Sequence, residues 1–290
     1  MIVNPTRRAL SLGALSAVLA ACSPLGAFNK VVPFDGGSVQ RAQGLAYGPG
    51  MRQQLDIYAP VERSGGAPVV VFYYGGSWNS GRRQDYAFVG HALAAQGIIT
   101  VIPDYRLVPA IAYPVFLEDC ASALAWVHRE IERHGGDASR LFLAGHSAGA
   151  YNAMMLAMAK ELLAPHGLTA ALLSGVAGLA GPYDFLPLRY RSTKEAFAGA
   201  ADLEATQPIN RVTAEAPPLF LASGAEDTLV EPRNSAVLAQ RARETGVPVV
   251  EKRYPGVGHA GLLLALSRPL RERAPVLDDL VSFFRSGISA

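Results

Sequence analysis

Residues 141–149 read LFLAGHSAG, an apolar run that passes directly into a G-x-S-x-G pentapeptide. The run Leu141–Ala144 predicts a buried strand, and the pattern of Ala148–Leu163 predicts a helix. A serine on a tight turn between a strand and a helix projects its hydroxyl above the sheet edge, where the helix N-terminus favours negative charge. Glycines two residues before and after the serine let the strand and the helix approach closely. Ser147 is therefore the predicted catalytic nucleophile.

The same alternation of strand and helix continues along most of the chain. Apolar, β-rich runs predict strands at Gln54–Tyr58, Pro68–Tyr74, Ile98–Pro103, Leu141–Ala144, Ala170–Val176, Leu219–Ser223 and Val249–Tyr254. Helical patterns lie at Tyr86–Gln96, Tyr113–Arg133, Ala148–Leu163, Glu231–Thr245 and Val276–Arg285. Several strands are continuously apolar, as expected when both faces of a parallel sheet are covered. We predict an α/β fold, with a mostly parallel central sheet flanked by helices, as a single domain over residues 51–290.

The N-terminal segment predicts export. Arg7 and Arg8 precede an apolar run that is too short for a comfortable membrane span and ends in small residues before Cys22. This pattern resembles the signal peptide and lipobox of bacterial lipoproteins, which implies that residues 1–21 are removed and that Cys22 is lipidated. Residues 22–50, rich in Gly and Pro, are then expected to be a tether. The expected location is the periplasmic side of a bacterial cell-envelope membrane, held by the lipid anchor alone.

Composition narrows the classes of partner. The formal net charge is +2 and no basic block occurs, so a nucleic-acid partner is not expected. The two cysteines form no disulfide framework, because Cys22 is consumed by the anchor and Cys120 is expected to be a small buried hydrophobe. No histidine and carboxylate cluster has metal-ligand spacing, so we predict neither a metal nor a cofactor.

A seryl hydroxyl needs a base, and one histidine is placed to supply it. The strand–GHSAG–helix segment resembles the nucleophile elbow of α/β-hydrolases, in which the histidine follows the last strand. His259 is the only histidine in the chain beyond His166. It lies in the glycine-rich loop 256–261, directly after the predicted strand Val249–Tyr254. We predict that His259 is the catalytic base.

The acid that orients this histidine should lie between Ser147 and His259, at the carboxyl end of a strand. Asp227 follows the predicted strand Leu219–Ser223 by a short turn, and Asp184 follows the preceding strand. We prefer Asp227, because the acid is expected after the penultimate strand, and interpret Asp184 as a turn or cap residue.

A glycine pair leaves a central strand at Gly75 and Gly76, where backbone N–H groups can point into a cleft. The segment 73–78, YYGGSW, resembles the HGG-[GAY]-W loop of hormone-sensitive-lipase-like, kynurenine-formamidase-like and isoprenylcysteine-methylesterase-like carboxylesterases. Further matches lie at 103–107 (PDYRL), 135–137 (GGD) with Arg140, and GHSAG. The resemblance implies an oxyanion hole formed by the N–H groups of Gly76 and Ala148, assisted by Gly75 or Ser77. One departure is Tyr74, which stands where that group usually has histidine.

These residues predict a serine carboxylesterase that hydrolyses small to medium carboxylic esters through an acyl-enzyme. Two alternatives stay open: an amidase of the kynurenine-formamidase type, and a hydrolase that has lost catalysis and binds a ligand. The long connection Gly178–Pro217 predicts a small helical cover between the strands that precede the acid. Trp78 and Tyr151 are the predicted substrate-binding residues.

Overall fold

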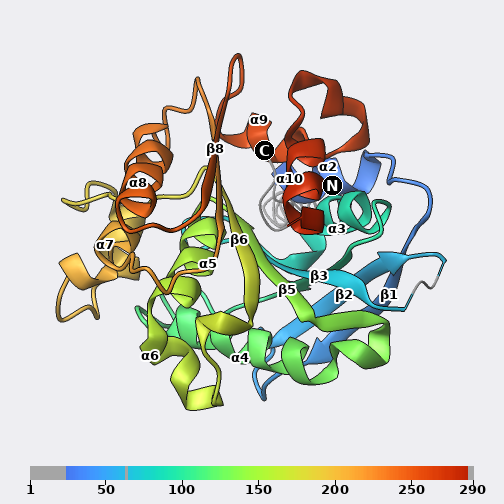
Figure 1. The fold of residues 1–290 in the computed structure, drawn as a ribbon, viewed down its shortest axis with the longest axis horizontal. Helices are drawn as coiled ribbons and strands as arrows, with labels where there is room; N and C mark the ends of the chain where they lie inside the picture. The colour runs from blue at the N-terminus through green and yellow to red at the C-terminus, as the bar shows by residue number, and fades with distance from the viewer. Residues whose placement is uncertain (1–23, 63–64, 287–290) are drawn as a thin grey trace, which may run out of the picture.

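The apolar runs of the sequence form the centre of a twisted sheet in the computed structural model, which describes residues 24–62 and 65–286 (Figure 1). Within these residues eight strands have the order β1-β2-β4-β3-β5-β6-β7-β8. The strands from β4 to β8 along this order pair in parallel, and β1 and β2 are antiparallel. The strands are β1 Ser38–Ala46, β2 Gln54–Pro60, β3 Ala67–Tyr73, β4 Ile99–Pro103, β5 Gly136–His146, β6 Leu173–Leu179, β7 Leu219–Gly224 and β8 Val249–Tyr254.

Helices cover both faces of this sheet, which explains why its central strands are apolar throughout. Figure 1 shows α4, α5, α6 and α8 on one side and α3 and α10 on the other. The helices are α2 Pro24–Val31, α3 Ala87–Ala94, α4 Val115–Glu130, α5 Ala148–Met158, α6 Lys160–Leu163, α7 Arg191–Ala196, α8 Arg233–Glu244, α9 His259–Leu264 and α10 Val276–Ser286. None of the helices in the described ranges is long and apolar enough to cross a membrane.

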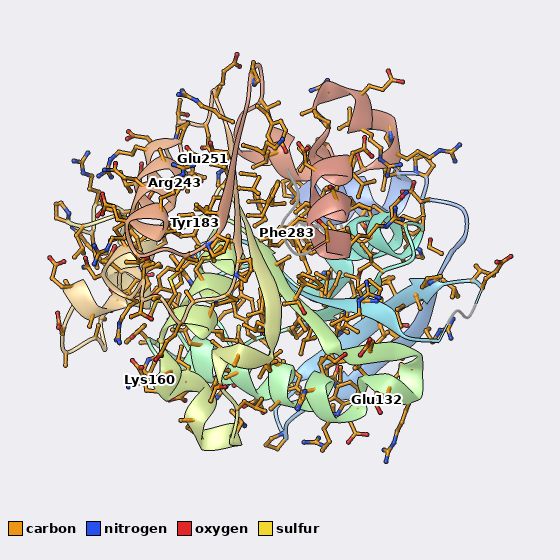
Figure 2. All side chains as sticks on the ribbon, viewed as in Figure 1. Glu132, Lys160, Tyr183, Arg243, Glu251 and Phe283 are labelled. Carbon is orange, nitrogen blue, oxygen red and sulfur yellow. The ribbon has the colours of Figure 1, made fainter. Side chains whose placement is uncertain are left out.

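The core lies between the sheet and these helices. All seven residues of β3 are buried, as are all five of β4. Phe283 of α10 is labelled in Figure 2. Its ring packs between Phe142 of β5 and Phe220 of β7, with ring centroids 6.0 and 5.6 Å away. Cys120 is buried in α4, where burial raises the pKa of its thiol, in agreement with the predicted apolar role. The predicted α/β fold with a mostly parallel sheet is confirmed.

The prediction of a tether over residues 22–50 is wrong from residue 24 onward. The helix α2 packs on α3 through Phe28 and Phe88, whose rings meet edge-on at 5.6 Å. Strand β1 adds an antiparallel edge to β2, and Asp35 forms a two-point ion pair with Arg271 at 2.8 and 2.9 Å. The folded unit therefore begins before residue 51. The sequence did not indicate this, because the edge strand β1 is polar and half-exposed rather than apolar. The predicted signal peptide and Cys22 lie outside the described residues.

The predicted cover occupies the connection between β6 and β7. It contains α7 and two short 3-10 helices, Glu204–Thr206 and Pro208–Asn210. The last of these contacts both α5 and α8, so the cover rests on the helices beside the carboxyl ends of the strands.

Candidate active site

Ser147 occupies a sharp turn between β5 and α5. Its backbone has φ 55° and ψ −124°, a conformation that L residues rarely adopt. The flanking glycines are sterically required, because a Cβ on Gly145 would lie 2.3 Å from the Gly149 carbonyl. A Cβ on Gly149 would lie 2.0 Å from the carbonyl oxygen of Tyr73 in β3. Ser147 itself is only 8% exposed and lines a pocket at the carboxyl ends of the strands.

His259 and Asp227 meet although 32 residues separate them. His259 is the first residue of α9, and its Nδ1 lies 2.7 Å from Oδ2 of Asp227, in the turn after β7. The other carboxylate oxygen accepts the backbone N–H groups of Leu229 and Val230, each at 2.9 Å. Burial alone would raise the pKa of Asp227, but the hydrogen bonds from His259 and the two backbone groups outweigh it and lower that pKa. Asp227 is thus an ionised acceptor that holds His259 with its proton on Nδ1.

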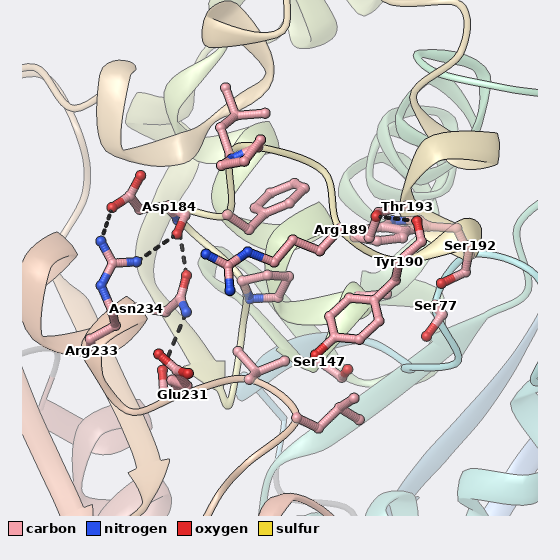
Figure 3. Close-up of a pocket in the computed structure, with 18 of the residues that line it drawn as sticks. Ser77, Ser147, Asp184, Arg189, Tyr190, Ser192, Thr193, Glu231, Arg233 and Asn234 are labelled. Carbon is pink, nitrogen blue, oxygen red and sulfur yellow. Dashed lines mark hydrogen bonds and ion pairs between the residues drawn. The ribbon is translucent and has the colours of Figure 1, made fainter.

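Asp184, the alternative acid, has a different partner. Its carboxylate forms an ion pair with Arg233 of α8 at 2.5 Å, on the wall of the pocket (Figure 3). The backbone N–H of Asp184 donates to Asn234 Oδ1 at 3.0 Å. Asp184 therefore anchors the cover to α8, in keeping with a structural role.

His259 lies against the turn that carries Ser147. The Nε2 atom of His146, the residue before Ser147, is 3.1 Å from the carbonyl oxygen of His259, and the two imidazole rings are 4.7 Å apart. The turn that carries Asp227 lines the same pocket as Ser147. The Ser147 hydroxyl makes no hydrogen bond to another side chain in the described part of the chain. In ligand-free hydrolases this bond is often long and tightens only when substrate binds.

The loop after β3 supplies backbone donors beside Ser147. Gly76 has φ 129°, and Ser77 and Trp78 follow with φ 50° and 60°. Strained backbone of this kind persists where the surrounding structure enforces it, commonly at functional sites. Within the described residues the N–H groups of Gly76 and Ala148 have no protein acceptor. The N–H of Gly75 instead donates to the hydroxyl of Tyr86 at 3.2 Å and so stabilises the conformation of the loop. The N–H groups of Gly76 and Ala148 are left as the donors without an acceptor among the described residues.

Tyr74 replaces the usual histidine without loosening this loop. Its hydroxyl donates to Asp104 at 2.9 Å and accepts from Arg52 at 2.7 Å. Its ring stacks on Tyr105, with centroids 4.7 Å apart. Arg83, which belongs to none of the sequence motifs, pairs with both Asp56 and Asp104. A buried ion-pair network therefore fixes the end of β3, from which the loop 74–78 leaves.

The pocket has a volume of about 420 Å³. Figure 3 shows Ser147 and, from the cover, Tyr190 on one side and Asn234 and Glu231 on the other, with the side chain of Arg189 extending between them. Phe185, Leu229 and Trp78 add apolar surface. The pocket thus combines apolar walls with hydrogen-bonding groups, as small-molecule sites commonly do. No three His, Cys, Asp or Glu side chains in the described ranges gather closely enough to hold a metal ion.

The two predicted substrate-binding residues have different positions. Trp78 lines the pocket, and its indole N–H donates to Asn152 at 3.0 Å. Tyr151 is fully buried and absent from the pocket wall, with its hydroxyl donating to the carbonyl oxygen of Thr206 in the cover. Since α5 turns Tyr151 toward the base of the cover, this residue holds the cover in place and does not reach the pocket.

Comparison with known proteins finds relatives that are named as esterases. The chain is 30% identical over 278 residues to a probable isoprenylcysteine alpha-carbonyl methylesterase from Oryza sativa, covering 88% of the chain and 65% of the relative. It is 29% identical over 245 residues to Esterase LipC from Mycobacterium tuberculosis, covering 76% of the chain and 60% of the relative. The chain thus spans under two thirds of the length of these curated relatives.

Solved structures share the fold. Esterase B from Lactobacillus rhamnosis superposes with a TM-score of 0.80 at 20% identity, over 96% of this chain and 94% of that one. A truncated carbohydrate esterase from gut microbiota has a TM-score of 0.76 at 18% identity, over 88% of this chain and 99% of that one. The BD-FAE family model matches residues 55–242, more than half of the chain, from β2 to α8. The chain therefore belongs to the BD-FAE family and has the α/β-hydrolase fold.

Proposed function

We propose that this protein is a serine carboxylesterase in which Ser147, His259 and Asp227 form the catalytic triad. The observation that carries the proposal is the 2.7 Å contact between His259 Nδ1 and the buried Asp227 carboxylate, in a histidine that also touches the nucleophile elbow. With the proton of His259 held on Nδ1, its Nε2 keeps a free lone pair for the serine proton. The esterase relatives support the same reaction class.

The reaction has two steps. Ser147 Oγ attacks the ester carbonyl carbon while His259 Nε2 takes its proton, and the N–H groups of Gly76 and Ala148 stabilise the negative oxygen. The alcohol leaves with the proton of His259, which yields the acyl-enzyme. Water then attacks the acyl carbon, again losing a proton to His259, and the acid is released as Ser147 regains its hydrogen. The Asp227 carboxylate stabilises the imidazolium in both steps.

The pocket supports small to medium esters as substrates. Its volume of about 420 Å³ suits a small acyl or aryl group with part of an alcohol. The named activities of the relatives, a methylesterase and a carbohydrate esterase, also concern esters. Feruloyl or acetyl esters of sugars are within this range.

The test is hydrolysis of p-nitrophenyl acetate by the wild-type protein and by Ser147→Ala. We expect turnover that the substitution abolishes, together with labelling of Ser147 by a fluorophosphonate. A panel of acyl esters, acetylated xylan, feruloyl esters and N-formylkynurenine then identifies the class of substrate. A folded wild-type protein that hydrolyses none of these would exclude the esterase, and preference for N-formylkynurenine would establish the amidase.

We also propose that the protein is exported and anchored through lipid on Cys22. Support comes from Arg7, Arg8 and the apolar run that ends at Cys22. Expression in a bacterial host with radiolabelled palmitate should label the wild-type protein and leave Cys22→Ser unlabelled. Equal labelling of both proteins, or of neither, would contradict the anchor.

A further inference from the structure

His146 lies between the nucleophile and the base of the proposed triad. It is the last residue of β5, adjacent to Ser147, and is 5% exposed. Its Nε2 is 3.1 Å from the carbonyl oxygen of His259, a contact between residues 113 positions apart. The mechanism above does not use this side chain, although it contacts the backbone of the base directly.

The contact determines which nitrogen of His146 carries the proton. A carbonyl oxygen only accepts, so a hydrogen bond requires a proton on Nε2. The other tautomer would place two lone pairs against each other at 3.1 Å and would bury an unpaired N–H, because Nδ1 has no partner in the described part of the chain. Nδ1 of His146 faces Gly75: a Cβ added to Gly75 would lie only 3.2 Å from this nitrogen. The neutral Nε2–H tautomer is the form that this site accepts.

The surroundings also keep His146 uncharged. Burial, together with repulsion from His259, lowers the pKa of His146 to about 3. A neutral ring is needed at this position because His259 becomes positively charged in each step of the reaction, with its centroid only 4.7 Å away. A second positive charge there would oppose proton transfer from Ser147.

We propose that His146 is a positioning residue, whose Nε2–H holds the backbone of His259 at the residue next to the nucleophile. The inference rests on the proposed triad and adds a member that acts through His259. The base belongs to the short helix α9 and the nucleophile to the β5 turn, so a direct hydrogen bond between the two segments fixes their separation. A displacement of about 1 Å between reacting groups can cost about 100-fold in rate, so such a bond affects kcat strongly.

Two amide substitutions separate positioning from simple packing. In His146→Gln the side-chain amide nitrogen can reach the position of Nε2 and donate to the His259 carbonyl. In His146→Asn the shorter amide reaches only the position of Nδ1 and leaves that carbonyl without this donor. Both variants are polar, uncharged and smaller than histidine, so a packing role predicts that the shorter Asn and the longer Gln differ in stability but not in kcat per folded molecule.

The experiment measures kcat and KM for p-nitrophenyl acetate, with active sites counted by fluorophosphonate titration and folding monitored by thermal unfolding. We expect His146→Asn to lower kcat by about 10- to 100-fold with KM changed less than about threefold, and His146→Gln to stay within about threefold of wild type. Equal kcat values for the two variants, whether high or low, would overturn the proposal.

A second measurement needs no variant to fold. Long-range ¹H–¹⁵N correlation spectra of the wild-type protein report the protonation of each imidazole nitrogen. We expect one histidine to remain in the neutral Nε2–H form from about pH 5 to 9. Titration of every histidine across that range, or only Nδ1–H forms among those that do not titrate, would refute the positioning bond. Failure of the proposed function would instead appear as a wild-type protein that no fluorophosphonate labels, whatever the tautomer of His146.

Discussion

Replacing Asp227 by asparagine should remove most of the activity while leaving the fold intact. The Oδ1 atom of the new amide can still accept the N–H groups of Leu229 and Val230, which Asp227 now accepts at 2.9 Å. Its NH₂ group would then face His259 Nδ1, from which the carboxylate now accepts a hydrogen bond at 2.7 Å. Two donors cannot share this contact, so the imidazole would shift its proton to Nε2 and lose its basicity toward Ser147.

The expected loss is about 10⁴-fold in kcat, or about 5.5 kcal/mol of transition-state stabilisation at about 1.4 kcal/mol per tenfold. The assay is initial-rate hydrolysis of p-nitrophenyl acetate, with the folded fraction checked by circular dichroism. Asp184→Asn is the matched control, because it changes the same functional group and weakens only the ion pair with Arg233. We expect the kcat of that control to fall by less than about threefold, because ion pairs near the surface contribute little. A larger loss in Asp184→Asn than in Asp227→Asn would refute the assignment of the acid.

Three further outcomes test the strain, packing and charge of the site. Ser147→Gly should unfold at a temperature about 2 °C higher than wild type in calorimetry, because glycine adopts φ 55° with less strain; an unchanged or lower value would argue against stored strain. Gly149→Ala should lower the free energy of unfolding in urea by several kcal/mol, because the added Cβ would lie 2.0 Å from the carbonyl oxygen of Tyr73. Gly36→Ala, where the added Cβ meets open space, should match wild type. Because the pKa of Asp227 is lowered in the folded state, its stabilising effect is complete above the unfolded pKa of about 3.9 and disappears as pH falls through the folded value. The gap in unfolding temperature between wild type and Asp227→Asn should therefore be constant from about pH 8 to 5 and shrink below about pH 4; a gap that widens on acidification would contradict the direction of the shift.

The sequence predicted the elements that are marked by their own residues, without reference to distant parts of the chain. Buried strands such as Ala67–Tyr73 are apolar throughout, and the glycines around Ser147 report a steric requirement that the structure bears out. The edge strand Ser38–Ala46 has no such signal, because it is half-exposed and its register with β2 is interrupted twice. This strand forms because it pairs with β2. Contacts between residues far apart in the chain, such as Asp35 with Arg271, hold the segment in place.

The contacts within the candidate site were less predictable. Chain order indicated that Asp227 and His259 follow neighbouring strands, and the structure brings the two side chains together. The sequence could not show that the Gly75 N–H donates to Tyr86. From the sequence, the Tyr151 side chain could point either toward the pocket or toward the cover. Its position on α5 directs it toward the cover, where its hydroxyl donates to the carbonyl oxygen of Thr206. His146 lay inside the motif that was used to identify Ser147, and only the fold shows that its side chain reaches His259.

The cover has a consequence for how this scaffold diversifies. It departs from β6 and returns in β7, two strands that pair directly, with Val176 opposite Leu219. An insertion whose ends are already held together adds only about 0.6 kcal/mol of closure entropy when its length doubles. Exchange of this segment for one of another size should therefore alter which molecules enter the pocket while the sheet keeps its register. The sheet and the turns that carry Ser147, Asp227 and His259 can then stay unchanged while the cover changes.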